Sequence, residues 1–153
     1  MDFERAKWLG FYYLGIKMRT EYELRKKLKD KGADEAMCDK TIDFLKEYRY
    51  IDDVEYARCY IIDSCNIKKQ GIRRILGDLR HKGINDNILE DVMMDLELDF
   101  ESNLAALIET RARGMQLTDP KQKNRLVGYL LRRGYGLNDI FSGIREYMED
   151  MNG

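Results

Sequence analysis

The feature that most constrains the fold of this chain is a short pattern that occurs three times. Leu24 to Gly32 reads LRKKLKDKG, Ile75 to Gly83 reads ILGDLRHKG, and Leu126 to Gly134 reads LVGYLLRRG. The glycines stand at 32, 83 and 134, so both intervals are 51 residues (83 − 32 and 134 − 83). A fixed period of this length indicates one supersecondary unit that is copied three times.

Each copy repeats the same frame around its glycine. An apolar residue lies eight positions before the glycine, a leucine four before it, a base directly before it, and another apolar residue ten after it. The apolar residues before the glycine are Leu24, Ile75 and Leu126, and the leucines are Leu28, Leu79 and Leu130. The bases are Lys31, Lys82 and Arg133, and the apolar residues after the glycine are Ile42, Met93 and Ile144. A unit of about fifty residues buries too little surface to be stable alone, so neighbouring copies should pack together. We therefore expect tandem repeats at 1–51, 52–102 and 103–153.

Apolar spacing and helix-end signals predict three helices in each copy and no strand. Thr20 and Glu23 form a capping box, Asp52 and Glu55 form another helix start, and the pair Asp119-Pro120 starts a helix in the third copy. The third, sixth, seventh and ninth helices are expected at about 34–48, 85–98, 100–113 and 137–148, and the first at 3–18, with fraying at the carboxyl end of the chain. The third copy should direct Leu126, Val127, Leu130 and Leu131 into its core. The fold class expected is all-α, with nine helices in three stacked three-helix repeats.

Composition limits the class of protein further. Hydrophobic residues are 44% and charged residues 36% of the 153-residue chain, and there is one proline, which suits a soluble helical protein. No apolar run approaches the roughly 20 residues that span a bilayer, and the start MDFERAK lacks the features of a signal peptide. Three cysteines without a CxxC pattern make a poor disulfide or zinc framework. We expect a cytoplasmic location, no membrane partner, and a role in the core for Cys38 and Cys65.

No catalytic pattern stands out. Neither G-x-x-x-x-G-K-[ST] nor G-x-G-x-x-G occurs, so no phosphate-binding loop is predicted. His81 is the only histidine, and its basic neighbourhood near a helix end favours a structural role. We therefore expect no enzyme, no cofactor and no metal site.

Charge is distributed unevenly along each copy, although the formal net charge is only −1. The middle segments 17–32, 68–83 and 119–134 carry +4, +5 and +4, whereas the final segments 33–51, 84–102 and 135–153 carry −2, −7 and −3. Each copy thus has a basic middle helix and an acidic final helix. Segregated charge of this kind is evidence about binding partners and not about the fold.

The basic middle helices are candidates for contact with a polyanion, for which phosphate is the usual target. The candidate residues are Arg25, Lys26, Lys29, Arg73, Arg74, Arg80, Lys82, Arg125, Arg132 and Arg133. A base before the terminal glycine also stabilises the negative end of the helix dipole, so a structural role could explain Lys31, Lys82 and Arg133. On the acidic side, Glu90, Asp91 and Asp95 are a possible contact face for protein, although such carboxylates are usually a solvated face.

The chain resembles the RecX family, the modulators of the bacterial recombinase RecA. The residues that carry the resemblance occur in order along nearly the whole chain: Leu14, Arg19-Thr20, Glu23-Leu24, Leu28 and Lys31-Gly32; then Ile51, Asp52-Asp53 and Tyr56-Ala57; then Gly71, Arg73-Arg74-Ile75, Leu79 and Lys82-Gly83-Ile84; and finally Leu126, Tyr129 to Tyr135, and Ile140. The match departs at the first helix, which has Gly10, Gly15 and Trp8, and at the start of the third copy.

The resemblance implies three tandem three-helix repeats that form an elongated, curved protein. It implies binding in the groove of the RecA filament on single-stranded DNA, with contacts to more than one protomer. It implies negative control of ATP hydrolysis, strand exchange and filament growth, and hence a role in DNA repair, recombination and the SOS response. Direct binding to single-stranded DNA would be weak or would depend on RecA, and we expect a monomer. Two alternatives remain open: a separate nucleic-acid-binding module of the helix-turn-helix type, and a general helical scaffold for protein partners.

Overall fold

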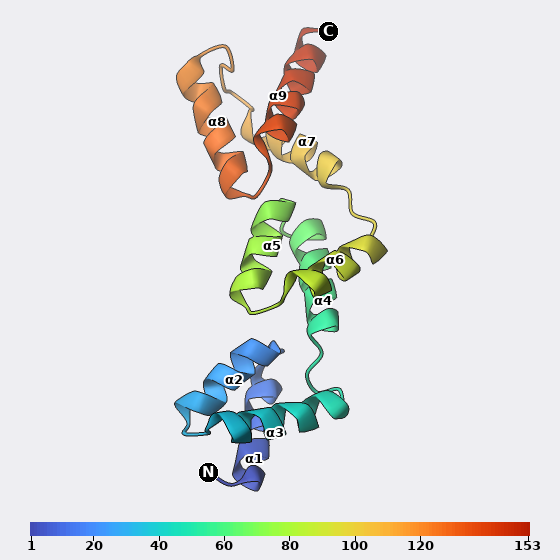
Figure 1. Ribbon diagram of the computed structural model, residues 1–153. Coiled ribbons are helices and arrows are strands. Elements are labelled where there is room, and N and C mark those ends of the chain that lie inside the picture. The colour runs from blue at the N-terminus through green and yellow to red at the C-terminus, as the bar shows by residue number, and fades with distance from the viewer. The chain divides into compact units, whose positions relative to one another are not determined.

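The computed structural model describes residues 1–153 and contains nine α-helices and no strand (Figure 1). The all-α class and the three helices expected in each copy are therefore confirmed. The helices are α1 (Phe3–Ile16), α2 (Glu21–Asp30), α3 (Glu35–Glu47), α4 (Asp53–Asn66), α5 (Ile72–His81), α6 (Asp86–Asp95), α7 (Phe100–Arg111), α8 (Pro120–Arg132) and α9 (Leu137–Asn152).

The chain divides into two compact units whose border does not follow the repeats. The first unit comprises residues 1–59 and 79–95, and the second comprises residues 60–78 and 96–153. The division thus runs through α4 and α5, so that the middle copy contributes to both units. The repeat boundaries expected from the 51-residue period stay a prediction.

The core of the first unit is formed mainly by α1, α2 and α3. Leu24 and Leu28, two positions of the recurring frame, are fully buried, and α3 adds Ile42 at 1% exposure. Leu9 of α1 completes this cluster, together with Tyr13, Ala33, Cys38, Leu45 and Ile51. The leucines lie four residues apart on one face of α2, which is the spacing that an amphipathic helix needs to bury a stripe.

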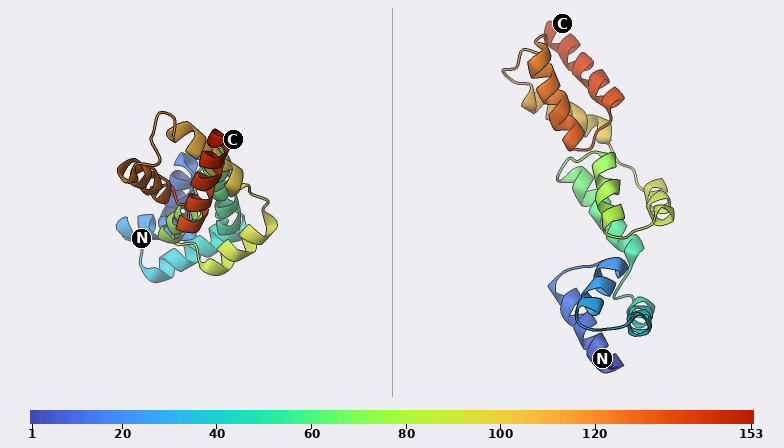
Figure 2. Two further views of the ribbon diagram at one scale, coloured as in Figure 1. Left: turned by 90° about the horizontal axis from the view of Figure 1, so that it is seen from above. Right: turned by 60° about the vertical axis from the view of Figure 1, so that its left-hand side comes forward.

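The core of the second unit gathers side chains from α7, α8 and α9, and α9 packs against both of the other helices (Figure 2). Leu126, Leu130, Ile140 and Ile144 are all buried here, as the period predicts. The prediction for Leu131 was wrong, because 41% of this residue is exposed. Leu126 and Leu130 are one helical turn apart and share the buried face, whereas the next residue is rotated by about 100° toward solvent.

The helix ends follow the sequence signals closely. Thr20 and Glu23 form the capping box, and Asp119 caps α8 with Pro120 in its first turn. Gly32, Gly83 and Gly134 have φ angles of 102°, 85° and 104°, the left-handed conformation that lets a helix end at glycine.

Two helix ends differ from the expectation by three residues or more. The helix α6 ends at Asp95 and not near Leu98, because Asp99 caps α7 by accepting a hydrogen bond from the Ser102 N–H at 3.0 Å. At the carboxyl end, α9 continues to Asn152 where fraying was expected, and the Gly153 N–H still donates to the Glu149 carbonyl at 2.9 Å.

Candidate functional site

The first unit contains a joint between the start of α2 and the turn that follows α5. The Thr20 hydroxyl donates to the Lys82 carbonyl at 2.5 Å, and the Lys82 ammonium lies 3.7 Å from the Glu23 carboxylate. Gly83 fits closely against Tyr22, and a Cβ at position 83 would overlap the tyrosine side chain. The amino-terminal end of one middle helix therefore meets the carboxyl-terminal end of the middle helix in the next copy.

The second unit contains the same joint, one period later. The Gly71 N–H donates to the Arg133 carbonyl at 2.7 Å, and the Arg73 N–H donates to the Gly134 carbonyl at 3.2 Å. The Tyr135 hydroxyl donates to the Lys69 carbonyl at 2.7 Å, and burial raises the pKa of this phenol to about 12. The joint is thus built from backbone groups and from a tyrosine that stays protonated at neutral pH.

The two joints explain why threonine and glycine occupy equivalent positions. The Thr20 N–H donates to the Glu23 carboxylate at 3.0 Å, and the Thr20 hydroxyl oxygen accepts from the Glu23 N–H at 3.2 Å. The hydroxyl proton can therefore be donated to the next copy. The second copy has Arg74 in place of that glutamate, and the Gly71 N–H pairs directly with the neighbouring turn. A Cβ at position 71 would stand 2.6 Å from the Tyr135 nitrogen, so only glycine allows this approach.

Two candidate cations belong to these joints. Lys82 and Arg133 carry the carbonyls that the joints use, and neither side chain is fully exposed. Arg133 also donates to the Lys68 carbonyl. The structural interpretation of these two bases is therefore well supported, whereas Lys31, their counterpart in the first copy, is exposed.

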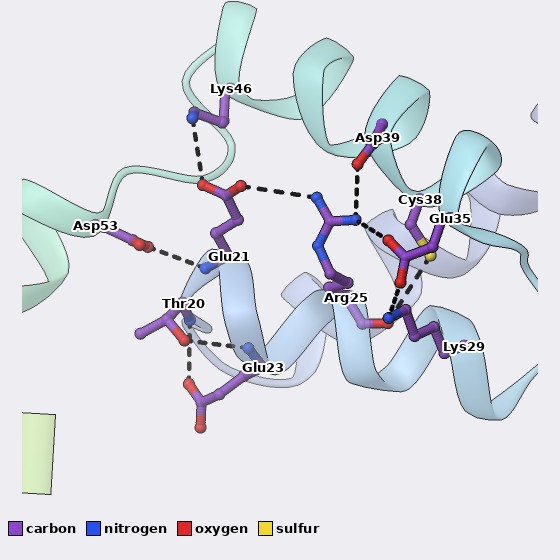
Figure 3. A network of polar contacts seen from close by, with 10 residues as sticks. All are labelled: Thr20, Glu21, Glu23, Arg25, Lys29, Glu35, Cys38, Asp39, Lys46 and Asp53. Carbon is purple, nitrogen blue, oxygen red and sulfur yellow. Dashed lines mark hydrogen bonds and ion pairs between the residues drawn. The ribbon is translucent and has the colours of Figure 1, made fainter. Parts of the chain in front are cut away.

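Arg25 is held inside an ion-pair network that joins α2 to α3 (Figure 3). Its guanidinium lies 2.8 Å from the Asp39 carboxylate, 3.2 Å from Glu35 and 3.9 Å from Glu21. Burial alone would lower the pKa of Arg25, but the hydrogen bond and the charge of Asp39, aided by Glu35, raise it. This candidate cation is therefore already paired within the chain, because α3 supplies Glu35 and Asp39 as its carboxylate partners.

The other candidate cations differ in how far they are neutralised. Lys29 pairs with Glu35, Arg80 pairs with Asp86 at 2.8 Å, and Arg74 lies 3.9 Å from Asp78. Four exposed candidates have no carboxylate partner: Lys26, Arg73, Arg125 and Arg132. These four come from α2, α5 and α8, the three basic middle helices.

The acidic candidates lie on α6. Glu90, Asp91 and Asp95 are all exposed, and none forms an ion pair. No group of three or more histidine, cysteine or acidic side chains is arranged to hold a metal ion. Burial raises the pKa of the Cys38 and Cys65 thiols, which favours the core role expected for them. None of the nine helices has the length and apolar character that crossing a membrane requires.

The sequence did not indicate two features that the structure reveals. Gly71 occupies the position equivalent to Thr20, 51 residues later, and its contact with a turn 62 residues away in the chain has no local signal. A groove between α7 and α9 also went unpredicted, because its small floor residues, Ala105 and Gly143, resemble ordinary helix positions.

Comparison with known proteins identifies the family. The family models for the first, second and third three-helix domains of RecX match residues 6–45, 52–93 and 99–142. A Clostridium botulinum protein named regulatory protein RecX is 33% identical over 135 residues, which is 86% of this chain and 63% of that protein. The Clostridium acetobutylicum protein of the same name is 32% identical and is matched over 71% of its length. This chain therefore spans somewhat less than two thirds of the first relative.

The fold agrees with these sequence matches. The crystal structure of RecX from Lactobacillus salivarius superposes with a TM-score of 0.82 at 25% identity, covering 94% of this chain and 95% of that one. Three family models in tandem, over nine helices without strands, show three successive three-helix domains. Both Clostridium relatives are named regulatory proteins. The chain belongs to the RecX family of regulatory proteins.

Proposed function

We propose that this chain binds the filament that RecA forms on single-stranded DNA and slows its ATP hydrolysis, strand exchange and growth. The observation that carries the proposal is the match of all three RecX domains, in order, along one chain. Through RecA the chain would modulate DNA repair and recombination. We further propose that it acts as a monomer in the cytoplasm, with repeats at 1–51, 52–102 and 103–153.

The unpaired bases suggest how the chain would meet DNA in the filament. Lys26, Arg73, Arg125 and Arg132 are exposed and have no carboxylate partner, so pairing with phosphate would break no internal ion pair. Each phosphate that such a side chain neutralises releases counterions, which makes binding favourable and sensitive to salt. Arg25, Lys82 and Arg133 would contribute less, since they stabilise the fold.

The acidic helix α6 suggests a second contact, with protein. Glu90, Asp91 and Asp95 would be repelled by phosphate, but they could pair with basic side chains of a RecA protomer. Electrostatic complementarity of this kind sets orientation and the rate of association more than affinity. The basic helices would then face DNA, and α6 would face protein.

Charge-neutralising variants can test the DNA side of this interface. Replacing Arg125 and Arg132 with glutamine should weaken binding to the RecA filament and should reduce the salt dependence of log K by about 1 per lost phosphate contact. The matched control replaces Lys40 and Arg145, two exposed bases outside the middle helices. Equal effects of the two double variants would remove α8 from the proposed interface.

A further inference from the structure

A groove runs between α7 and α9 in the second unit. Two adjoining hollows line it, and they share Ala105, Gly143 and Glu146. Leu104 and Tyr135 border one hollow, and Tyr147, Met151 and Gly114 border the other. The groove therefore has an apolar floor that extends along both helices.

Small side chains create the groove. A Cβ on Gly143 would stand 2.7 Å from the Ile108 Cδ1, so glycine is what lets α9 approach α7 closely at this point. Ala105 is exposed on α7, where a larger residue would fill the space. The small residues therefore leave a depression between α7 and α9, and this depression is open to solvent.

The walls of the groove are acidic. Glu101, Asp139, Glu146 and Asp150 line the hollows and form no ion pair. Glu109 has a cation partner, Arg113, at 4.0 Å, but both side chains are largely exposed and the pair is weak. Arg113 is the only base among the lining residues. Carboxylates therefore surround an apolar strip on both helices.

We propose that this groove binds a basic amphipathic segment of a protein partner. The apolar face of such a segment would cover Ala105 and Gly143, and its lysines or arginines would pair with the unpaired carboxylates. Nucleic acid does not fit, because phosphate would be repelled. The groove is separate from the basic helices assigned to DNA, so this site goes beyond the proposed function.

The test measures the anisotropy of a fluorescent 14-residue leucine–lysine peptide that is amphipathic as a helix. Neutralising Glu146 and Asp139 (E146Q/D139N) should weaken its binding about three- to tenfold. Filling the floor with Ala105→Tyr should weaken binding more than tenfold without changing the charge. The control D43N/E47Q removes two exposed carboxylates from α3, outside the groove, and should leave binding unchanged.

Three outcomes would overturn the proposal. A scrambled peptide of equal composition could bind as tightly, which would mean that charge alone is recognised. The variant A105Y could bind the peptide as well as the parent protein, which would place the peptide elsewhere. Sedimentation could show that the chain self-associates and that A105Y abolishes this, which would assign the groove to a second copy. Circular dichroism and melting curves of each variant would verify folding. Because none of these assays contains RecA, failure of the groove proposal would not affect the proposed function.

Discussion

The joint between the repeats predicts unequal costs for the same substitution at equivalent glycines. Gly32 and Gly134 end the first and third middle helices with φ angles of 102° and 104°. Alanine in this conformation costs about 1–2 kcal/mol at either position. A Cβ at position 32 meets nothing within 4 Å, whereas at position 134 it would stand 2.5 Å from the Arg74 Cβ and 2.7 Å from the Gly71 carbonyl oxygen.

The overlap at position 134 should add about 1–3 kcal/mol, the usual cost of overpacking. We therefore expect Gly32→Ala to lower the free energy of unfolding by about 1–2 kcal/mol and Gly134→Ala to lower it by about 2–5 kcal/mol. In a thermal melt of a chain of this length, each kcal/mol lowers the Tm by about 2–4 °C. The backbone strain is the same at positions 32 and 134. The additional loss of unfolding free energy in Gly134→Ala therefore measures the packing of the joint.

Hydrogen exchange gives a local readout of the same effect. The Gly71 amide donates to the Arg133 carbonyl across the joint, so its protection should fall in Gly134→Ala and stay unchanged in Gly32→Ala. Equal losses of stability in the two variants, or unchanged protection at Gly71, would refute the inference that this turn packs against the preceding copy.

Three further predictions concern single side chains. Burial raises the pKa of Asp53 above its usual 3.8, so the folded state binds the proton more tightly, and stability should fall as pH rises from about 3.8 through the native pKa; Asp53→Asn should lack this component, and identical pH–stability curves would contradict it. Arg25→Met should cost about 1 kcal/mol by leaving its carboxylate partners unpaired, while exposed Lys26→Met should be neutral; matching melting temperatures would refute the tie between α2 and α3. Leu131→Gln should change stability by less than about 0.5 kcal/mol, whereas Leu130→Ala should cost about 2–5 kcal/mol in urea denaturation; similar costs would contradict the observed burial.

Local signals predicted the helices well because their causes lie within one or two turns. A capping box at Thr20, a proline after Asp119 and glycines at a period of 51 residues act over a few positions, and the structure has each where it was expected. The prediction that Leu131 is buried failed because two adjacent leucines give no indication of which one faces inward. That choice depends on where α7 and α9 pack, which local spacing does not encode.

The candidate site was only partly predictable because its members are sorted by contacts distant in sequence. The pattern marked Arg25 and Lys26 alike as bases on α2, but α3 supplies Glu35 and Asp39 to only one of them. Likewise, each of the three copies has a base before its glycine, so the sequence alone does not distinguish the three bases. Lys82 lies at a joint because Thr20 of the preceding copy meets its carbonyl, a contact between residues 62 positions apart.

RecA-catalysed ATP hydrolysis on single-stranded DNA, with and without substoichiometric amounts of this chain, tests the proposed regulation most directly. We expect the chain to slow hydrolysis and to bind the same DNA only weakly when RecA is absent. The near-neutral formal charge of −1 agrees with weak binding to bare DNA. An unchanged rate, together with tight and salt-sensitive binding to bare DNA, would contradict the proposal and would favour a separate nucleic-acid-binding module.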